Sequence, residues 1–217
     1  GAVQFFIDNF PRLRDAFLTT MSMSLLGGLL ALVLGTLLAA FRVSPITPLR
    51  GLSTFYVETF RNTPLTVVFF FIIFGLPQID FAVGFFTGSV LAIGLYTAAF
   101  VCEAVRSGIN AVSPGQAEAS RAIGLTFGQS LREVVLPQAF RTVVPPLGNV
   151  WIAMVKNTSI AAGFAVTELT ASLQRLSNAN AGALLLVLLA VVGGYMLITV
   201  PSAVLINRVE RRVAILR

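Results

Sequence analysis

The chain has 217 residues, of which 56% are hydrophobic and only 11% are charged, and its formal net charge is +6. Because soluble domains carry about 25% charged residues, this composition excludes an ordinary soluble domain. One Cys and no His exclude a disulfide framework and leave no side chains suited to a zinc or haem site, so we expect no bound metal.

Five apolar segments follow one another along the chain. A helix needs about 20 mainly apolar residues to cross a hydrocarbon core of ~30 Å, and each segment meets or approaches that length. A soluble protein could bury one or two such segments but not five. We therefore predict an all-α, polytopic membrane protein that forms one domain over residues 1–217. The predicted spans are residues 16–41, 62–79, 84–105, 142–167 and 180–207.

The elements before the third span carry local signals of their own. Four apolar residues near the start recur at helical spacing, which predicts a short interfacial helix leading into the first span: Phe5, Phe6, Phe10 and Leu13. Residues 42–61 are expected to form a loop. Thr63 and Pro64 predict the start of the second span, with Thr63 at the N-cap and Pro64 at the first helical position.

A long polar stretch, residues 113–137, separates the third and fourth spans. Ser113 is placed as an N-cap, with Pro and Gln following at the first and third helical positions. Gly124 stands where a glycine ends a short helix, and Thr126 with Gln129 repeats the capping pattern. We therefore predict two short helices hinged at Gly124. The first is rich in alanine and slim enough to insert into a groove on another protein.

Lys156 falls inside the fourth predicted span, near the middle of the bilayer. An ammonium there costs at least about 2.5–3.5 kcal/mol, so such a residue usually faces a cavity or a partner. One hypothesis is that it lines a path and meets the carboxylate of a substrate, together with the polar residues that follow: Asn157, Thr158 and Ser159. The alternative is a structural ion pair with Glu103 or Glu58, or hydrogen bonds to carbonyls of a broken helix.

The arginines predict the orientation in the membrane. With five spans, residues 42–61, 106–141 and 208–217 fall on one side, and most arginines lie there. The positive-inside rule makes that side cytoplasmic, with the N-terminus outside and the C-terminus inside. The charge of +6 therefore reflects orientation and contact with anionic lipid headgroups, and nucleic acid is not an expected partner. Arg61 is predicted as a cytoplasmic membrane anchor, and Glu103 with Arg106 as a local pair.

The polar stretch also carries a motif. Its order is Glu118-Ala119-Ser120, three residues, Gly124, nine residues, then Val134-Val135-Leu136-Pro137. This resembles the EAA loop of binding-protein-dependent ABC importer permeases, whose consensus is E-A-A, three residues, G, nine residues, I-x-L-P. Ser120 and Val134 are mild departures from that consensus.

The resemblance extends beyond this loop. Arg61-Asn62-Thr63-Pro64-Leu65, Ser107-Gly108-Ile109 and Lys156-Asn157-Thr158-Ser159 are similar to the polar amino acid branch of these permeases. Val43-Ser44-Pro45, residues 61–66 and Gly115-Gln116-Ala117-Glu118 look closest to glutamate-uptake permeases of actinobacteria.

The resemblance implies a type I ABC importer permease with five spans in the cytoplasmic membrane of a bacterium. Such a subunit would move a polar amino acid, glutamate or glutamine first, by alternating access. Its implied partners are a second permease that is a copy or a homologue, two cytoplasmic ATPase subunits and an extracytoplasmic amino-acid-binding protein. The chain contains no G-x-x-x-x-G-K-[ST] loop, so ATP and Mg²⁺ are expected on the ATPases, with no cofactor or catalytic residue here.

The resemblance also implies site residues. The ATPase-docking residues of the coupling loop would be Glu118, Ala119, Arg121, Gly124 and Leu125. For Glu118 the alternative is a solvated charge, or an i,i+3 pair with Arg121 worth a few tenths of a kcal/mol. The substrate path would include Thr63, Lys156, Asn157, Thr158, Ser159 and Glu168. Glu168 is expected at the outer end of span four, either as a solvated loop charge or in contact with the binding protein or the outer vestibule.

Two functions from other classes compete with this interpretation. A self-sufficient secondary transporter or channel should carry more buried carboxylates and an internal repeat. An intramembrane enzyme would need a catalytic constellation inside the spans. The sequence contains none of these features, so we predict a transporter subunit that is not an enzyme.

Overall fold

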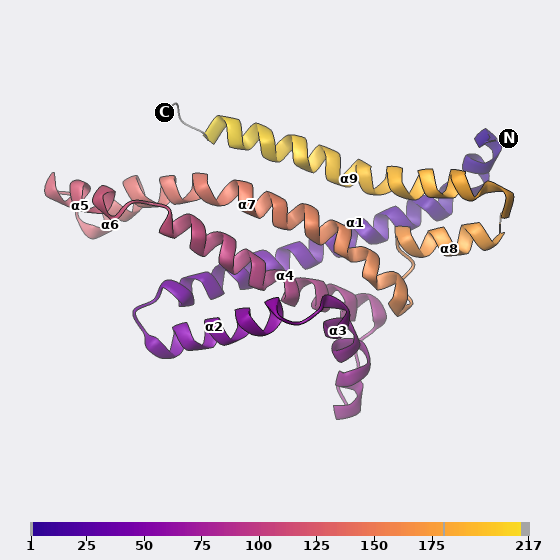
Figure 1. Ribbon diagram of the computed structural model, residues 1–217, viewed down its shortest axis with the longest axis horizontal. Coiled ribbons are helices and arrows are strands. Elements are labelled where there is room, and N and C mark those ends of the chain that lie inside the picture. Colours follow the sequence, from indigo (N-terminus) through magenta and orange to yellow (C-terminus); the bar gives the residue numbers. More distant parts are fainter. Residues whose placement is uncertain (1, 180, 214–217) are drawn as a thin grey trace.

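The computed structural model describes residues 2–179 and 181–213, which are almost entirely helical and include no strand (Figure 1). The α-helices are α1 (Ala2–Val43), α2 (Thr47–Arg61), α3 (Leu65–Phe70), α4 (Phe85–Asn110), α5 (Pro114–Ala122), α6 (Phe127–Gln129), α7 (Leu136–Asn157), α8 (Leu169–Ala179) and α9 (Leu184–Val213). π-helical turns cover Phe71–Gly75 and Ser130–Val135, and 3₁₀ turns cover Leu76–Ile79, Thr158–Phe164 and Ala181–Ala183.

Three helices, α1, α4 and α9, are long and apolar enough to cross a membrane. Two bent pairs could each add a span: α2 with Leu65–Ile79, bent by 104°, and Phe127–Phe164 with α8, bent by 50°. The described residues therefore hold three to five candidate spans. Predicted spans 16–41 and 84–105 fall on α1 and α4. The span predicted at 180–207 covers the 3₁₀ turn Ala181–Ala183 and most of α9, and its residue 180 lies outside the described residues.

A helix starts where the second span is predicted to begin, but its N-cap is Pro64 and not Thr63, and the loop predicted before it is wrong. Residues 47–61, expected as a loop, form α2, and Asn62 is its C-cap. Pro64, with extended backbone, is the N-cap of α3, while the hydroxyl of Thr63 donates to the carbonyl of Thr59 at 2.7 Å. The reason is that α2 is amphipathic: Ser53 and Val57 are buried on one side, whereas Leu52 and Phe55 face outward. The search for uncharged segments did not reveal this helical periodicity, because α2 contains charged residues.

The interfacial helix expected before the first span is continuous with it, because α1 runs unbroken past Pro11. Its long contact with α4 is close because small residues line it. A Cβ on Gly35 would lie 2.5 Å from the Val101 Cβ, and one on Gly27 would lie 3.3 Å from Ile93 Cγ2. Such residues let membrane helices approach closely. On the other side of α4 lies α7, with α9 beside it (Figure 1).

Candidate coupling segment and translocation face

The segment between α4 and α7 lies at one end of the molecule, where α5 and α6 project beyond the other helices (Figure 1). Helix α5 ends in a Schellman motif. The Gly124 N–H donates to the Arg121 carbonyl at 3.0 Å, and the Leu125 N–H donates to the Ser120 carbonyl at 3.2 Å. Gly124 has φ +93°, and a Cβ there would meet nothing within 4 Å, so the backbone and not the space requires glycine. The predicted short helix that ends at Gly124 is confirmed, but the helix after it is not short, because from Phe127 it continues through the π turn into α7.

One of the two predicted capping boxes is present. Thr126 Oγ1 accepts the Gln129 N–H at 3.3 Å, and Gln129 Oε1 accepts the Thr126 N–H at 2.9 Å. Ser113 is the N-cap of α5 as expected, but its side chain makes no capping hydrogen bond. The Gln116 side chain instead lies 3.5 Å from Gln138 Nε2, which draws it away from the helix start.

A hydroxyl pair fastens the two halves of this segment to each other. Ser120 Oγ on α5 hydrogen-bonds Ser130 Oγ on the π turn, and both residues are buried. Together with the Schellman motif and the capping box, this pair holds the segment in one shape by contacts within it.

The outer face of the segment has no covering element in the described chain. Glu118, Ala119, Arg121 and Gly124 are exposed, and Leu125 is partly buried. Among the described residues Glu118 makes no ion pair, so the expected alternative of a pair with Arg121 is absent. Two large apolar side chains close to these polar residues in the segment are 81% and 74% exposed: Ile123 and Phe127. An exposed apolar patch with a polar rim is typical of a protein interaction site. Large apolar residues within the polar stretch 113–137 were the sequence signal that could have identified these side chains as docking residues.

Lys156 lies in the last turn of α7 with its side chain exposed. Within the described residues it has neither an ion pair nor a hydrogen bond, and the two carboxylates proposed as partners are engaged elsewhere. Glu103 contacts arginines, and Glu58 Oε2 accepts from Asn62 Nδ2 at 3.2 Å. The structure therefore does not contain the structural pair considered for Lys156.

Asn149 shares the exposed side of α7 with Lys156, because seven residues make about two helical turns. Asn149 was not among the site residues predicted from the sequence. Its position seven residues before Lys156, within the same predicted span, was the signal that could have identified it. Asn157, the next residue after Lys156, lines a small hollow of about 190 Å³ between α4 and α7 with Tyr96 and Phe100. This part of α7 is a polar face on a candidate membrane helix, and we call it the α7 polar face: Asn149, Lys156 and Asn157.

The other predicted path residues do not join this face. Thr158 is buried, and its hydroxyl donates to the Val155 carbonyl at 2.6 Å, while Ser159 is partly buried. Thr63 lines a separate groove between α2, α3 and α4. Glu168 lies near α9. The six residues predicted from the sequence are therefore divided among different places in the fold.

Glu168 is completely buried, which excludes the solvated loop charge considered for it. The Tyr195 hydroxyl donates to its Oε2 at 2.6 Å, and the Ala171 N–H donates to its Oε1 at 2.8 Å. The next residue, Leu169, donates its N–H to Thr20 Oγ1 at 3.2 Å. Glu168 thus caps the first turn of α8 and ties that helix to α9, while its neighbour ties it to α1.

We expect Glu168→Ala to destabilise the protein by about 1–3 kcal/mol, because the partly buried N–H of Ala171 would lose its side-chain acceptor and Tyr195 would keep only its hydrogen bond with Thr170. Glu168→Gln keeps one acceptor oxygen and should lose less. Thermal melting of the purified protein in detergent measures both, with the exposed Glu118→Gln as the control. Wild-type melting of Glu168→Ala would contradict the structural role.

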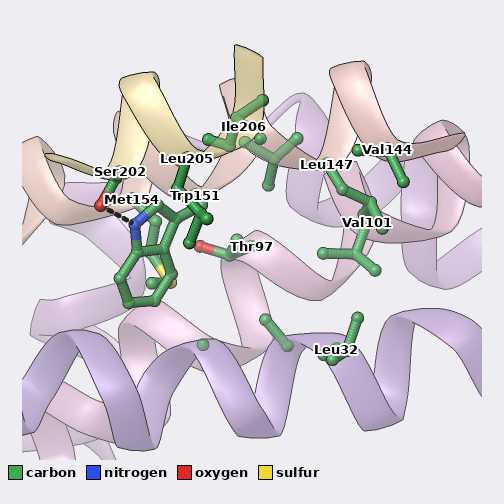
Figure 2. Close-up of a pocket in the computed structure, with 14 residues that line it drawn as sticks. Leu32, Thr97, Val101, Val144, Leu147, Trp151, Met154, Ser202, Leu205 and Ile206 are labelled. Carbon is green, nitrogen blue, oxygen red and sulfur yellow. Dashed lines mark hydrogen bonds between the residues drawn. The ribbon is translucent and has the colours of Figure 1, made fainter. Parts of the chain in front are cut away.

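The cavity in Figure 2, of about 430 Å³, lies between α1, α4, α7 and α9 and is almost wholly apolar. The Trp151 indole N–H donates to Ser202 Oγ at 3.0 Å, joining α7 to α9 (Figure 2). The cavity is also lined by Leu32, Val101 and Leu147 (Figure 2). No charged side chain lines it, so a polar amino acid would lose its hydration there without compensation. The cavity is therefore not a candidate substrate site.

Comparison with known proteins covers nearly the whole chain. The family model for binding-protein-dependent transport system inner membrane components matches residues 15–215. The glutamate transport system permease protein GluC of Corynebacterium glutamicum is 40% identical over an aligned length of 217 residues, covering 94% of this chain and 95% of that protein. The probable glutamine ABC transporter permease protein GlnM of Bacillus subtilis is 36% identical over 210 residues, covering 97% of each.

One solved structure has the same architecture along almost its full length. The crystal structure of an amino acid ABC transporter with histidines superimposes with a TM-score of 0.87 at 29% sequence identity. The superposition covers 95% of this chain and 96% of that one.

Proposed function

The chain belongs to the family of binding-protein-dependent transport system inner membrane components, and from this premise we propose that it carries glutamate or glutamine across the membrane as the permease subunit of an ATP-driven ABC importer. It is a multi-pass protein of the bacterial plasma membrane. Transport would follow alternating access, with the helices moving around a site at the α7 polar face.

One observation carries the proposal: the exposed coupling segment and the α7 polar face are joined by a single helical run, Phe127–Phe164. The docking residues Glu118, Ala119, Arg121, Gly124 and Leu125 precede this run, and the hydroxyl pair of Ser120 and Ser130 joins α5 to its first turns. Lys156 and Asn157 stand near its end. Movement of a partner bound to the segment would thus reach the polar face without crossing a flexible loop.

The proposed partners follow from three features: the sequence has no G-x-x-x-x-G-K-[ST] loop, the coupling segment is exposed, and the α7 polar face is exposed. Two ATPase subunits would bind ATP and Mg²⁺ and dock on the coupling segment of each permease. A second permease, identical or homologous, would face the α7 polar face and complete the path. An extracytoplasmic binding protein would deliver the amino acid.

Reconstitution of the permease with its ATPase and binding protein in vesicles tests this function. We expect ATP-dependent accumulation of labelled glutamate or glutamine that requires all components. Accumulation by the permease alone, driven by an ion gradient, would favour the secondary transporter instead. Accumulation of neither amino acid by a complex that hydrolyses ATP would reject the substrate assignment.

We further propose that residues 1–217 form one permease domain with five spans, counting each bent pair as one, with the N-terminus outside and the C-terminus inside. The arginine distribution and the location of the coupling segment at the end of the molecule that also carries the α1–α2 turn support this orientation. On this scheme α8 lies at the outer end.

Cysteine labelling tests the orientation. The native Cys102 is buried and should remain silent. A membrane-impermeant maleimide applied to intact cells should label Asn178→Cys on α8 and spare Ile123→Cys, whose side chain is 81% exposed in the coupling segment. Permeabilised cells lacking the ATPase provide the control, because Ile123→Cys should then react. Labelling of Ile123→Cys from outside would reverse the orientation.

A further inference from the structure

Three arginines from three helices surround the single carboxylate of Glu103 on α4. Arg106 Nη2 lies 2.8 Å from Glu103 Oε2, Arg42 Nη1 lies 3.6 Å from Oε1, and Arg61 Nη1 lies 3.8 Å from Oε2. The predicted local pair of Glu103 and Arg106 is thus confirmed, and two further guanidiniums join it. We call this group the arginine cluster. It leaves two positive charges uncompensated near the ends of α1 and α4.

The cluster has more hydrogen-bond donors than Glu103 can satisfy. Each guanidinium carries several N–H groups and no acceptor. Nη1 of Arg42 is buried and has no hydrogen-bond acceptor within residues 2–179 and 181–213. The side chains of Arg61 and Arg106 remain 44% and 33% exposed, so part of each guanidinium is accessible to a further anion.

An apolar groove of about 390 Å³ lies between α2, α3 and α4, and α2 and α4 also carry Arg61 and Glu103 of the cluster. Thr59 and Thr63, which flank Arg61 in the sequence, line one end of it, and the groove continues along α3 and α4 past Val67 and Leu91. Outward side chains on this part of α2, such as Phe55, are apolar and exposed. These apolar surroundings add nothing to the binding of a soluble anion, whereas they favour the binding of an acyl chain.

We propose that the arginine cluster and this groove form a binding site for an anionic phospholipid. The headgroup phosphate would accept from Arg61 and Arg106, and an acyl chain would lie along α3 and α4. Charged N–H donors bind phosphate oxygens strongly, and basic pockets between membrane helices on the cytoplasmic side select anionic headgroups. The site is separate from the α7 polar face and does not depend on which amino acid is transported.

Thermal melting of the purified complex in neutral detergent, titrated with phosphatidylglycerol or phosphatidylcholine, tests the site. We expect phosphatidylglycerol alone to raise the melting temperature. Arg61→Gln should weaken its apparent affinity about fivefold, as expected for one arginine near a lipid headgroup. Val67→Trp, at a side chain that is 50% exposed, should do so by filling the groove. Arg50→Gln, an exposed arginine on the same helix, is the matched control and should bind as wild type.

Two outcomes would overturn the proposal. If phosphatidylglycerol raises the melting temperature of wild type and of both variants equally, the stabilisation is a general effect of charged micelles and not of this site. An Arg61-dependent shift produced equally by inorganic phosphate, and unaffected by Val67→Trp, would assign a free anion instead of a lipid. Native mass spectrometry, which counts lipids on the assembled complex, gives the same distinction, and Val67→Trp supplies it if Arg61→Gln does not assemble.

Discussion

Replacing Lys156 by Met is expected to lower amino acid uptake about ten- to a hundredfold, the effect of losing one hydrogen bond between charged groups. Lys156 is the only lysine of the chain and is exposed on a candidate membrane helix without a partner among the described residues. Every transported amino acid presents an α-carboxylate, which the hydrocarbon cannot compensate. Uptake by reconstituted complexes measures the loss. Lys156→Arg should keep part of the activity, since its charge persists while its geometry differs.

The structure sharpens this experiment. Because no carboxylate in the part of the chain that the structure describes pairs with Lys156, Lys156→Met should leave no unpaired carboxylate there, and the complex should assemble, melt and hydrolyse ATP at its basal rate as wild type. Asn149→Ala, on the same side of α7, should weaken uptake less. Full uptake by an assembled Lys156→Met complex would remove Lys156 from the path.

Replacing Gly124 by Val is expected to abolish substrate-stimulated ATP hydrolysis. A left-handed backbone costs a non-glycine residue roughly 1–2 kcal/mol, and β-branching adds to this. Since a Cβ has free space here, the loss would come from the backbone alone, through a changed exit direction of the chain after α5. Gly124→Asn is the matched control, because Asn tolerates this conformation and should keep most coupling.

Glu118→Lys should give the same loss for a different reason, since it reverses a charge on the docking face and leaves the backbone intact. Co-purification with the ATPase, measured beside stimulated ATP hydrolysis, distinguishes failed docking from failed transmission. If Gly124→Val and Glu118→Lys both retain binding and stimulation, the coupling segment has been misassigned.

The coupling segment could be predicted from the sequence because its signals are local. Thr126 with Gln129 and the position of Gly124 act within a few residues, and the structure has them where the pattern places them. The α1 and α4 helices were likewise predictable, because length and hydropathy suffice for them.

The rest depended on contacts between distant segments. Glu168 looked like a loop charge because Tyr195, its hydrogen-bond donor, lies far along the chain. Residues 47–61 looked like a loop because they lie between two apolar segments, yet they form α2, which packs against α1 and α4. Neither packing partner can be identified from a single sequence.

The continuous run from Phe127 to Phe164 also limits how this protein can change in length. One residue inserted into α7 between Asn149 and Lys156 would rotate every later side chain by about 100° around the helix axis and carry Lys156 away from the face that Asn149 defines. The turn at residues 80–84, in contrast, could take up an insertion without rotating either neighbour. The number of residues between the coupling segment and the α7 polar face therefore sets how the two are oriented relative to each other. This stretch should tolerate substitution far better than insertion or deletion.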